Sequence, residues 1–412
     1  MGTASETDVD LREIDITDPR WFADGPPHGL FARMRREAPI RWNANPHFGG
    51  FWSLTRAADV EAVSKDTATF SSHRGGIFLQ PDQVAPLDLT REVLLYKDPP
   101  DHTKYRKIMQ TAFVPATVAK LEGEVREIVT RVIDDVIERG ACDVVEDIAV
   151  RVPLLVLARL MALPEEDVPK LYEWTEAIEA SQRSIEPNQA VETFVAMAGY
   201  LFQQVEQQIG EGNAESLVMR LRNAEVDGDR LTDPEITTFF SLLVFAGNDT
   251  TRNTTSAGVL ALLEHPDQLA ILRDDRSLVG GAVEELLRWT SVVQWFVRTA
   301  TKDTQIGDQP IAEGDRVMLW YASASRDEER YADPQRFDVT RTDHAHAAFG
   351  GGGRHFCLGA GLARLELRVI FEELLRRMPD IELAGPVERV ETSWANALTS
   401  LPVRFTPGPR EG

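Results

Sequence analysis

The chain has 412 residues, of which 43% are hydrophobic, and its 66 acidic and 44 basic side chains give a formal net charge of −22. This apolar fraction is typical of a globular protein and excludes a disordered one, and the length allows a large buried core. The acidic charge opposes binding to nucleic acid or to an anionic membrane, and two cysteines are too few for a disulfide framework, which favours a reducing, cytoplasmic setting.

The N-terminal third is predicted to mix short elements with one long loop. Residues 1–20 have neither an apolar core nor a basic leader, so we expect a flexible segment without a signal peptide or membrane anchor. Phe51-Trp52-Ser53-Leu54 reads as a strand. Residues 71–97 lack a sustained period and are predicted to form a loop, and loops of this length in compact domains are usually functional.

Residues 102–222 are predicted to be helical almost throughout, with a polar, less regular interval over 170–190. Apolar residues recur at helical spacing in three segments, Val118–Ile137, Ile148–Met161 and Val191–Ile209. A longer helix can begin with Asp233 as its cap and Pro234 in its first turn, and it can run to Glu264. At roughly 1.5 Å per residue, it would cross a whole domain.

The middle of this long helix is polar, although its flanks are apolar. Residues 246–251 read Ala-Gly-Asn-Asp-Thr-Thr, and five of these six are poor helix formers. A break of this kind in a core helix often marks a functional site, and a threonine beside an aspartate can relay protons. From these residues alone, however, a polar kink with threonine bonded back to the helix carbonyls is favoured.

The C-terminal part is predicted to alternate short helices and strands before one strong helix. The expected elements are a helix ending in Glu284–Trp289, strands over Trp295–Thr301 and Arg316–Tyr321, a glycine run at 350–353, an amphipathic helix over Leu358–Met378 and a strand-like tail over 379–407. The ensemble is mostly α with minor β, an α+β fold. No boundary divides it, so we expect one domain over residues 1–412.

The loop before the last long helix, residues 348–359, combines four glycines with Cys357. Glycines allow backbone N–H groups to approach a sulfur atom, and the N-terminus of the following helix favours a thiolate. Taken alone, a cysteine is more often a small buried residue. The loop lacks the Gly-Lys-Ser/Thr ending of a phosphate loop, and Cys142 lies too far upstream to help form a zinc site.

This loop resembles the haem-binding signature of the cytochromes P450, Phe-Gly-x-Gly-x-His/Arg-x-Cys-x-Gly. Gly353, His355, Cys357 and Gly359 match in register. The position of the phenylalanine holds Gly350, and Phe349 comes one residue earlier, so the packing of Phe349 near the sulfur stays open. The resemblance implies a cytochrome P450 fold in which a long central helix lies over haem b and Cys357 is the axial iron ligand.

Other motifs of the family follow in the family's order over nearly the whole chain. Glu285, Arg288 and Arg341 resemble the charged triad that holds the cysteine loop, although Glu-x-x-Arg alone is usually a solvated pair. The resemblance implies that the haem propionates are bound by His102, Arg106, Arg298 and His355, with Phe349 and Gly359 also beside the cofactor. In the 246–251 segment, it implies that Gly247 leaves room for dioxygen, Thr250 hydrogen-bonds the bound oxygen and Asp249 delivers protons.

The implied activity is monooxygenation, the insertion of one oxygen atom from O2 into a C–H bond of a hydrophobic small molecule. A terpenoid, sterol, fatty acyl chain or aromatic compound would fit the positions that correspond to the family's pocket, which are the 72–97 loop, Val244, Ala246, Val293, Trp295, Phe296 and Leu398. Electrons would come from a separate ferredoxin and ferredoxin reductase, and the candidate docking cations are Lys104, Lys107, Arg354, Arg364 and Arg368. We expect a cytoplasmic monomer that binds neither nucleic acid nor membrane.

Two alternatives remain, a peroxide-driven haem-thiolate enzyme and a non-enzymatic haem sensor. The Asp249-Thr250 pair argues against the first, because peroxide needs no dioxygen proton relay.

Overall fold

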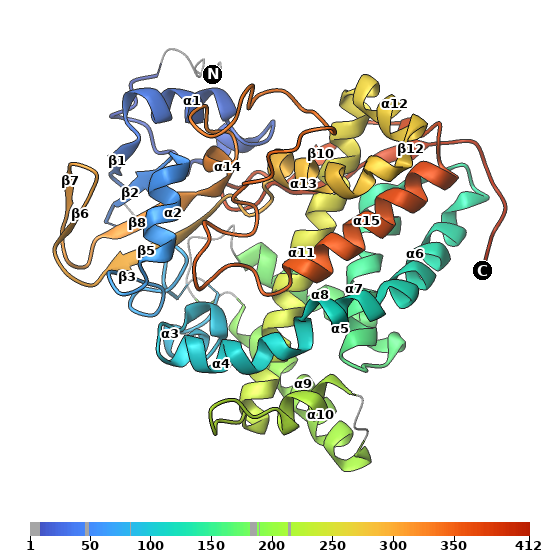
Figure 1. Ribbon diagram of the computed structural model, residues 1–412, viewed down its shortest axis with the longest axis horizontal. Helices are drawn as coiled ribbons and strands as arrows, with labels where there is room; N and C mark the ends of the chain where they lie inside the picture. The colour runs from blue at the N-terminus through green and yellow to red at the C-terminus, as the bar shows by residue number, and fades with distance from the viewer. Residues whose placement is uncertain (1–8, 46–48, 83, 182–187, 189, 213–215) are drawn as a thin grey trace.

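The long helix α11 (Asp233–Glu264) runs through the centre of the structure (Figure 1). The computed structural model describes residues 9–45, 49–82, 84–181, 188, 190–212 and 216–412. The N-cap of α11 is Thr232 and not Asp233, because Thr232 and Glu235 form a reciprocal capping box in which the Thr232 amide donates to the Glu235 carboxylate at 2.7 Å. Asp233 is the first helical residue.

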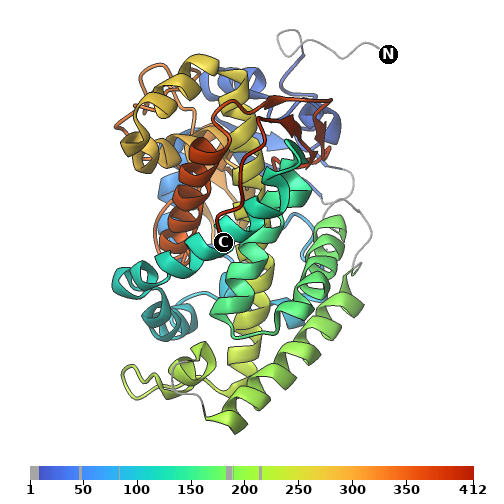
Figure 2. The same cartoon turned by 90° about the vertical axis from the view of Figure 1, so that its right-hand side faces the viewer.

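Most of the larger helices pack around α11, as the two perpendicular views show (Figures 1 and 2). They are α7 (Arg151–Leu160), α8 (Val168–Ser181), α9 (Val191–Glu211), α13 (Val279–Thr290) and α15 (Ala360–Arg377), whereas α6 (Glu122–Ile137) packs against α7 and α15. The shorter helices are α1 (His28–Glu37), α2 (Ala57–Lys65), α3 (Leu87–Thr90), α4 (Asp101–Met109), α5 (Pro115–Lys120), α10 (Leu217–Asn223), α12 (Pro266–Asp274) and α14 (Tyr321–Ala324). A π-helical turn, Val144–Ala149, leads into α7.

The main sheet lies at the side of the molecule opposite α6 (Figure 1). Its strand order is β1 (Ile40–Asn43), β2 (Phe51–Leu54), β8 (Arg316–Trp320), β5 (Trp295–Ala300) and β3 (Phe70–Ser71). The β2–β8 pair is parallel and the other pairs are antiparallel. Smaller sheets join β4 (Ala141–Asp143), β12 (Pro402–Arg404) and β9 (Glu382–Leu383), then β6 (Thr304–Ile306) with β7 (Gln309–Ile311), and β10 (Glu388–Arg389) with β11 (Leu398–Ser400).

The core follows α11, which is buried at every position from Thr251 to Leu262. A helix that is buried all round carries no amphipathic stripe, so its polar residues must find partners inside the protein. Within the described ranges, no helix combines the length and the apolar character needed to cross a bilayer.

The expected mixture of many helices and few strands is confirmed, and most predicted elements lie within a few residues of the observed ones. Two expectations change. The prediction of an irregular chain over 170–190 is wrong up to Ser181, because α8 occupies that part, and residues 182–187 and 189 lie outside the described residues. In the predicted N-terminal flexible segment, residues 1–8 lie outside the described residues, while Leu11 and Ile16 are buried in the core.

Candidate functional site

The glycine run before α15 has a conformational reason at each of its four positions. Gly350, Gly352 and Gly353 have φ values of +93°, +85° and +75°, in the left-handed region that other residues avoid. Gly351 lies against the end of α2, where an added Cβ would come within 2.9 Å of the Val60 carbonyl oxygen. The glycine run therefore allows a tight turn that packs directly against α2. This packing fixes the position of Cys357.

Cys357 lies one turn before α15, with its backbone fixed by a hydrogen bond from its amide to the Phe349 carbonyl at 3.1 Å. Burial raises the pKa of its thiol, while the amides of Gly359 and Ala360 and the nearby guanidinium of Arg106 act in the opposite direction. Donors aimed at a sulfur atom are the environment of a metal-bound thiolate. By contrast, burial raises the pKa of Cys142, in strand β4, to about 12.

Phe349 packs beside this loop despite its displacement by one residue from the signature. Its side chain is 9% exposed, its ring centroid lies 6.0 Å from that of Phe356, and the Arg364 guanidinium carbon lies 4.5 Å from its ring centroid. The additional glycine is absorbed in the left-handed turn that follows Phe349, so the ring stays next to the cysteine.

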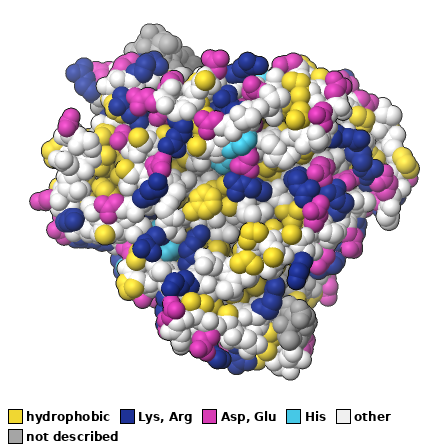
Figure 3. Space-filling model, in the orientation of Figure 1, with side chains coloured by type: hydrophobic (Ala, Val, Ile, Leu, Met, Phe, Trp, Pro, Cys, Tyr) yellow, Lys and Arg dark blue, Asp and Glu magenta, His cyan; other side chains and the backbone are white. Residues whose placement is uncertain are grey.

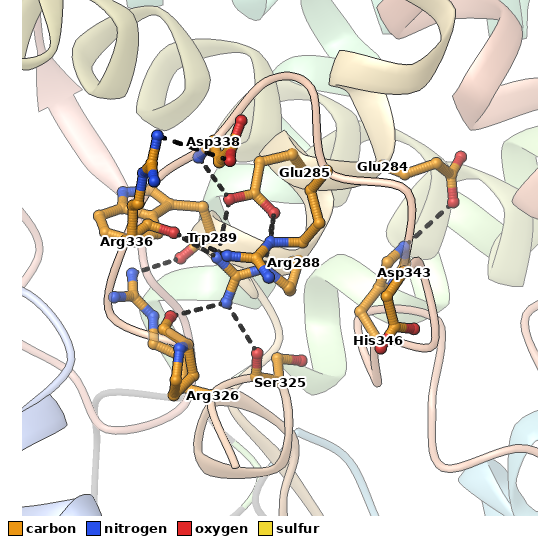
Figure 4. Close-up of polar contacts among 12 residues, drawn as sticks. Glu284, Glu285, Arg288, Trp289, Ser325, Arg326, Arg336, Asp338, Asp343 and His346 are labelled. Atoms are coloured by element: carbon orange, nitrogen blue, oxygen red, sulfur yellow. Dashed lines mark hydrogen bonds and ion pairs between the residues drawn. The ribbon is translucent and has the colours of Figure 1, made fainter. Parts of the chain in front are cut away.

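A buried charge network holds the chain that leads to this loop (Figure 4). Glu285 is fully buried and accepts hydrogen bonds from Nε and Nη2 of Arg288 at 2.6 and 2.8 Å and from the Asp338 amide at 2.8 Å, while Nε of Arg341 lies 3.2 Å from its Oε2. Arg288 also donates to the carbonyls of Ser325, Pro334 and Arg336. The structure thus brings the predicted Glu285, Arg288 and Arg341 together, with Arg341 held by its charge alone at Nε, which makes no hydrogen bond among the described residues.

The neighbouring residue Glu284 forms a second network that the sequence analysis missed. Its carboxylate accepts two hydrogen bonds from Arg364, at 2.6 and 2.9 Å, and lies 3.2 Å from Nε2 of His346. Figure 4 shows Glu284 and His346 facing each other across the loop that precedes the cysteine. Glu284 therefore ties α13 to both ends of the cysteine loop, and its adjacency to Glu285 was the one available signal.

Four predicted cofactor-binding residues form a group on the α4 side of the cysteine. The ring centroids of His102 and His355 lie 4.2 Å apart, burial lowers the pKa of His102 to about 4, and burial followed by the charge of Arg298 lowers that of His355. Burial also lowers the pKa of Arg106. Among the described residues, no carboxylate forms an ion pair with any of these four side chains, and the buried Nε of Arg298 and Nδ1 of His102 have no hydrogen-bond partner there.

Buried cations without acidic partners are unfavourable unless an anionic group joins them. The carboxylates of a haem would satisfy this need, so the residues present fit that cofactor. The described residues contain no group of three or more His, Cys, Asp or Glu side chains arranged to hold a metal ion. A single thiolate beside carboxylate-binding cations suits a metal whose remaining ligands come from a prosthetic group.

The predicted oxygen-activation segment lies within an uninterrupted part of α11, so the expected break in the helix is absent. The Thr250 hydroxyl donates to the Ala246 carbonyl at 2.9 Å, the bond that the simpler interpretation of the sequence expected, and its acceptor lone pairs remain available. Asp249 is buried. An added Cβ at Gly247 would lie 3.2 Å from Cδ2 of Leu157, so close packing of α7 on α11 also requires this glycine.

A small apolar cavity of about 40 Å³ lies between the 72–97 loop, α8, α9 and α11. Its lining includes Phe78, Val84, Val93 and Tyr96 from the loop, Ile178 and Met197 from α8 and α9, and Leu242 and Phe245 from α11. None of the described residues that line it is charged. Two of its hydroxyl donors are also engaged: Thr90 donates to the Leu87 carbonyl and Ser241 donates to the Thr237 carbonyl.

The six predicted pocket residues other than the loop are not among the residues that line this cavity. Val244, Trp295 and Leu398 are buried in the core, while Ala246, Val293 and Phe296 are partly accessible. Phe78, which does line the cavity, packs against two of them, with its ring centroid 6.5 Å from that of Trp295 and 6.2 Å from that of Phe296. Their role in substrate binding stays a prediction.

The predicted docking cations are mostly paired with acids. Four have carboxylate partners: Lys104 with Asp229, Lys107 with Asp227, Arg364 with Glu284, and Arg368 with Glu122 and Glu372. Arg354 donates instead to the Thr103 hydroxyl at 3.1 Å. Basic and acidic side chains alternate over the face that carries α4 and α15 (Figure 3). This face is therefore of mixed charge and is not a continuous basic patch.

Comparison with known proteins gives consistent results. The family model described as cytochrome P450 matches residues 185–379. The chain is 34% identical to a steroid C26-monooxygenase of Rhodococcus jostii, covering 95% of this chain and 84% of the relative, and 36% identical to a methyl-branched lipid omega-hydroxylase of Mycobacterium tuberculosis, covering 97% and 95%. A Mycobacterium marinum cytochrome P450 solved in complex with pseudoionone is 35% identical, with a TM-score of 0.86 over 97% of this chain and 100% of that chain.

Proposed function

This chain belongs to the cytochrome P450 family of haem b monooxygenases, and on that premise we propose that Cys357 is its axial iron ligand and that it hydroxylates the methyl-branched end of an apolar molecule. The observation that carries the ligand assignment is the half-buried Cys357, whose sulfur accepts from the amides of Gly359 and Ala360 beside cations that form no ion pair with an acid among the described residues.

When bound, the haem iron activates dioxygen, so that one oxygen atom enters a substrate C–H bond and the other leaves as water. The side chains of this protein perform the remaining tasks. His102, Arg106, Arg298 and His355 would bind the cofactor's carboxylates through charge-assisted hydrogen bonds. The Glu285–Arg288–Arg341 network would keep the cysteine loop in place behind the cofactor. Thr250 would accept and pass a proton at its hydroxyl oxygen, and Asp249 would supply that proton.

The apolar cavity supports the substrate class. Because none of the described residues that line it is charged, and because the hydroxyls of Thr90 and Ser241 already bond to the backbone, an anionic or strongly polar group would be poorly solvated there. The apolar end of a substrate would therefore enter first. The related proteins named as a steroid C26-monooxygenase and a methyl-branched lipid omega-hydroxylase favour a steroid side chain or a branched lipid chain as that apolar end.

The remaining parts of the proposal concern partners and setting. The family uses separate redox partners, and we propose a ferredoxin with its reductase as the electron donors. The partner would bind the face of mixed charge that carries α4 and α15, with Arg354 as a candidate contact. We further propose that the protein acts as a cytoplasmic monomer.

The ligand assignment is tested by the reduced, carbon monoxide difference spectrum. The wild-type protein and Cys142→Ser should give the red-shifted Soret band of thiolate-ligated haem, and Cys357→Ser should lose it. A thiolate spectrum that survives in Cys357→Ser but disappears in Cys142→Ser would overturn the assignment.

The substrate class is tested by titrating the ferric protein and following the change in spin state. A sterol with an intact side chain and a methyl-branched lipid should bind more tightly than a straight-chain fatty acid, and the product should carry a hydroxyl at the branched end. Phe78→Ala should weaken both preferred ligands, because the ring forms part of the cavity wall. Equal affinity for the straight chain, or hydroxylation only at ring carbons, would contradict the proposal.

A further inference from the structure

A surface groove of about 490 Å³ lies between α4 and the segment that joins α10 to α11. One wall consists of the first two turns of α4 and the two prolines before it, and the other is formed by residues 226–229; Figure 1 shows this segment below α4. Arg354, three residues before Cys357, completes the lining and donates to the Thr103 hydroxyl at 3.1 Å. The groove therefore opens beside the loop that carries the proposed iron ligand.

Residues 226–229, here called the acidic hairpin, form a tight turn centred on Asp227 and Gly228. The amides of Val226 and Asp229 each donate to the carbonyl of the other at 3.0 Å, and φ is +56° at Asp227 and +85° at Gly228. Positive φ at both central residues is typical of the turn that Asp-Gly sequences favour between antiparallel strands. The turn brings the two aspartates of the acidic hairpin to the same wall of the groove.

The acidic hairpin pairs with two lysines that lie about one turn apart on α4. Nζ of Lys104 is 2.9 Å from Oδ1 of Asp229, and Nζ of Lys107 is 2.6 Å from Oδ2 of Asp227. These four side chains are between 38% and 72% exposed. Ion pairs between exposed side chains contribute little to stability, so both lysines can exchange one carboxylate for another at small cost.

The groove is positive although the protein as a whole is acidic. Its described lining holds three bases and two acids, whereas the chain carries a net charge of −22. Arg354 forms no ion pair with an acid among the described residues. Outside the lining, Asp101 and Glu235 also act on Lys104, and Glu235 is already bonded to Tyr105 and to the cap of α11. Without the two aspartates of the acidic hairpin, three cations would face the groove next to the cysteine loop.

We propose that the acidic hairpin masks the docking site of an acidic electron carrier, whose carboxylates displace Asp227 and Asp229 from the two lysines of α4 while Arg354 binds a further carboxylate. The exchange replaces each ion pair by an equivalent one, so only a carrier that presents several carboxylates at this spacing gains by binding. Carriers with too few acidic groups leave the hairpin in place, which gives the site selectivity. This inference rests on the proposed docking of a ferredoxin to the face that carries α4 and α15.

The test measures how fast a reduced acidic two-iron ferredoxin reduces the ferric holoprotein in a stopped-flow experiment. Asp227→Asn/Asp229→Asn uncovers both lysines, and asparagine keeps the turn because it also tolerates positive φ. The second-order rate constant at low salt should rise roughly tenfold, at the lower end of the effect of electrostatic steering. It should fall more steeply with salt than the wild-type constant, and the two should converge near 1 M salt, where the screening length is about 3 Å.

The matched control is Glu225→Gln/Glu382→Gln, which removes the same two negative charges elsewhere. These exposed carboxylates pair with Arg230 and Arg404 and do not line the groove. The control should keep a rate constant near that of the wild type. Reduction by photoreduced deazaflavin, which needs no protein docking site, should be equal in all variants, and this separates docking from a change at the haem.

A readout independent of electron transfer is the binding of poly-L-glutamate to the holoprotein, followed by isothermal titration calorimetry at low salt. It should bind Asp227→Asn/Asp229→Asn several-fold more tightly than the wild type, and Lys104→Gln/Lys107→Gln added to that variant should remove the gain. An equal gain in the control variant would overturn the masking, because net charge and not the acidic hairpin would then explain it.

Arg354→Gln separates this inference from the proposed function. Slower reduction by ferredoxin in Arg354→Gln, with no gain in Asp227→Asn/Asp229→Asn over its control, would overturn the masking and leave the docking face intact. An unchanged rate in Arg354→Gln and in the aspartate variant would defeat the docking face itself. If the double variant does not fold, Asp229→Asn alone decides the question against Glu225→Gln, and equal rates in these two overturn the masking.

Discussion

Glu285→Gln should destabilise the protein more than any other single carboxylate-to-amide change in α13, because Glu285 is fully buried and has only donors around it. Oε1 faces Nη2 of Arg288 and the Asp338 amide, and Oε2 faces Nε of Arg288 and Nε of Arg341. In glutamine, one of these oxygens becomes an NH2 group, which can only donate. Whichever way the amide is turned, two neighbouring N–H donors then face this NH2 group and lose their acceptor.

The magnitude follows from the loss of the one carboxylate, among the described residues, that pairs with both the buried Arg288 and the partly buried Arg341. Removing one partner of a buried pair costs about 3–5 kcal/mol, because the remaining charge is left without compensation. Since a folded domain is typically stable by about 5–15 kcal/mol, this is a large fraction of the total. With a urea dependence of about 3 kcal/mol per molar, the unfolding midpoint should fall by about 1 to 1.7 M.

The assay is urea unfolding of the holoprotein, followed in parallel by tryptophan fluorescence, to which 8 tryptophans contribute, and by the Soret absorbance. Glu284→Gln provides a comparison in the same helix, because the Glu284 side chain is 15% exposed and its partner Arg364 is 37% exposed, so water can solvate the guanidinium that the substitution leaves unpaired. A cost below about 1 kcal/mol for Glu285→Gln, or a larger cost for Glu284→Gln, would refute the idea that burial of the charge network decides its contribution.

Two further predictions concern the cysteine loop. Gly353→Ala should reduce the amount of haem bound per protein and leave the far-ultraviolet circular dichroism unchanged. The φ of +75° at this position costs an alanine about 1–2 kcal/mol, and its Cβ would lie 2.8 Å from the Ser64 carbonyl oxygen. Wild-type haem content in this variant would contradict that reasoning. Glu284→Gln should lower the unfolding free energy at pH 7 by about 1.5–3 kcal/mol, the usual range for hydrogen bonds to a charged group. Hydrogen bonds from His346 and Arg364 outweigh burial and lower the pKa of Glu284 from 4.5 to about 2. Its contribution is therefore present above pH 4.5 and is lost as the pH falls toward 2; a difference between variant and wild type that stays constant over this range in urea titrations would argue against this assignment.

Sequence patterns predicted the helices and loops well where the local residues alone decide the backbone conformation. Periodic apolar residues identified the helices around α11, and the Gly-rich run before a strong helix identified the cysteine loop. The prediction of an irregular chain after residue 170 was wrong because α8 owes its order to packing against α9 and α11, while its polar composition weakens the sequence pattern. The expected break in α11 was also wrong, since burial on all sides outweighs the low helix propensity of residues 246–251.

The residues of the candidate site likewise fall into those that the sequence predicted and those that it did not. Cys357, the Glu285–Arg288–Arg341 triad and the His102–Arg106 pair could be named from the sequence because their motifs, taken together, resemble those of the family. Glu284 was passed over, because nothing in a linear pattern tells which of two adjacent glutamates faces the core. The sequence also did not predict that Phe245 and Ile178 line the cavity. These residues lie on two helices, and no local pattern specifies how one helix is rotated relative to the other.

The sequence by itself therefore determined where the backbone needs glycine and which reactive side chains are present. These are the left-handed glycines, the cysteine next to the start of a helix, and the acid–alcohol pair. Only the tertiary structure decided which charges share a buried space. Arg252 and Glu176 lie 76 positions apart in the chain and yet form an ion pair, and Glu179 joins the same guanidinium from the next turn of α8. Electrostatic effects depend on distance and on burial, and both are properties of the folded chain that spacing in the sequence does not contain.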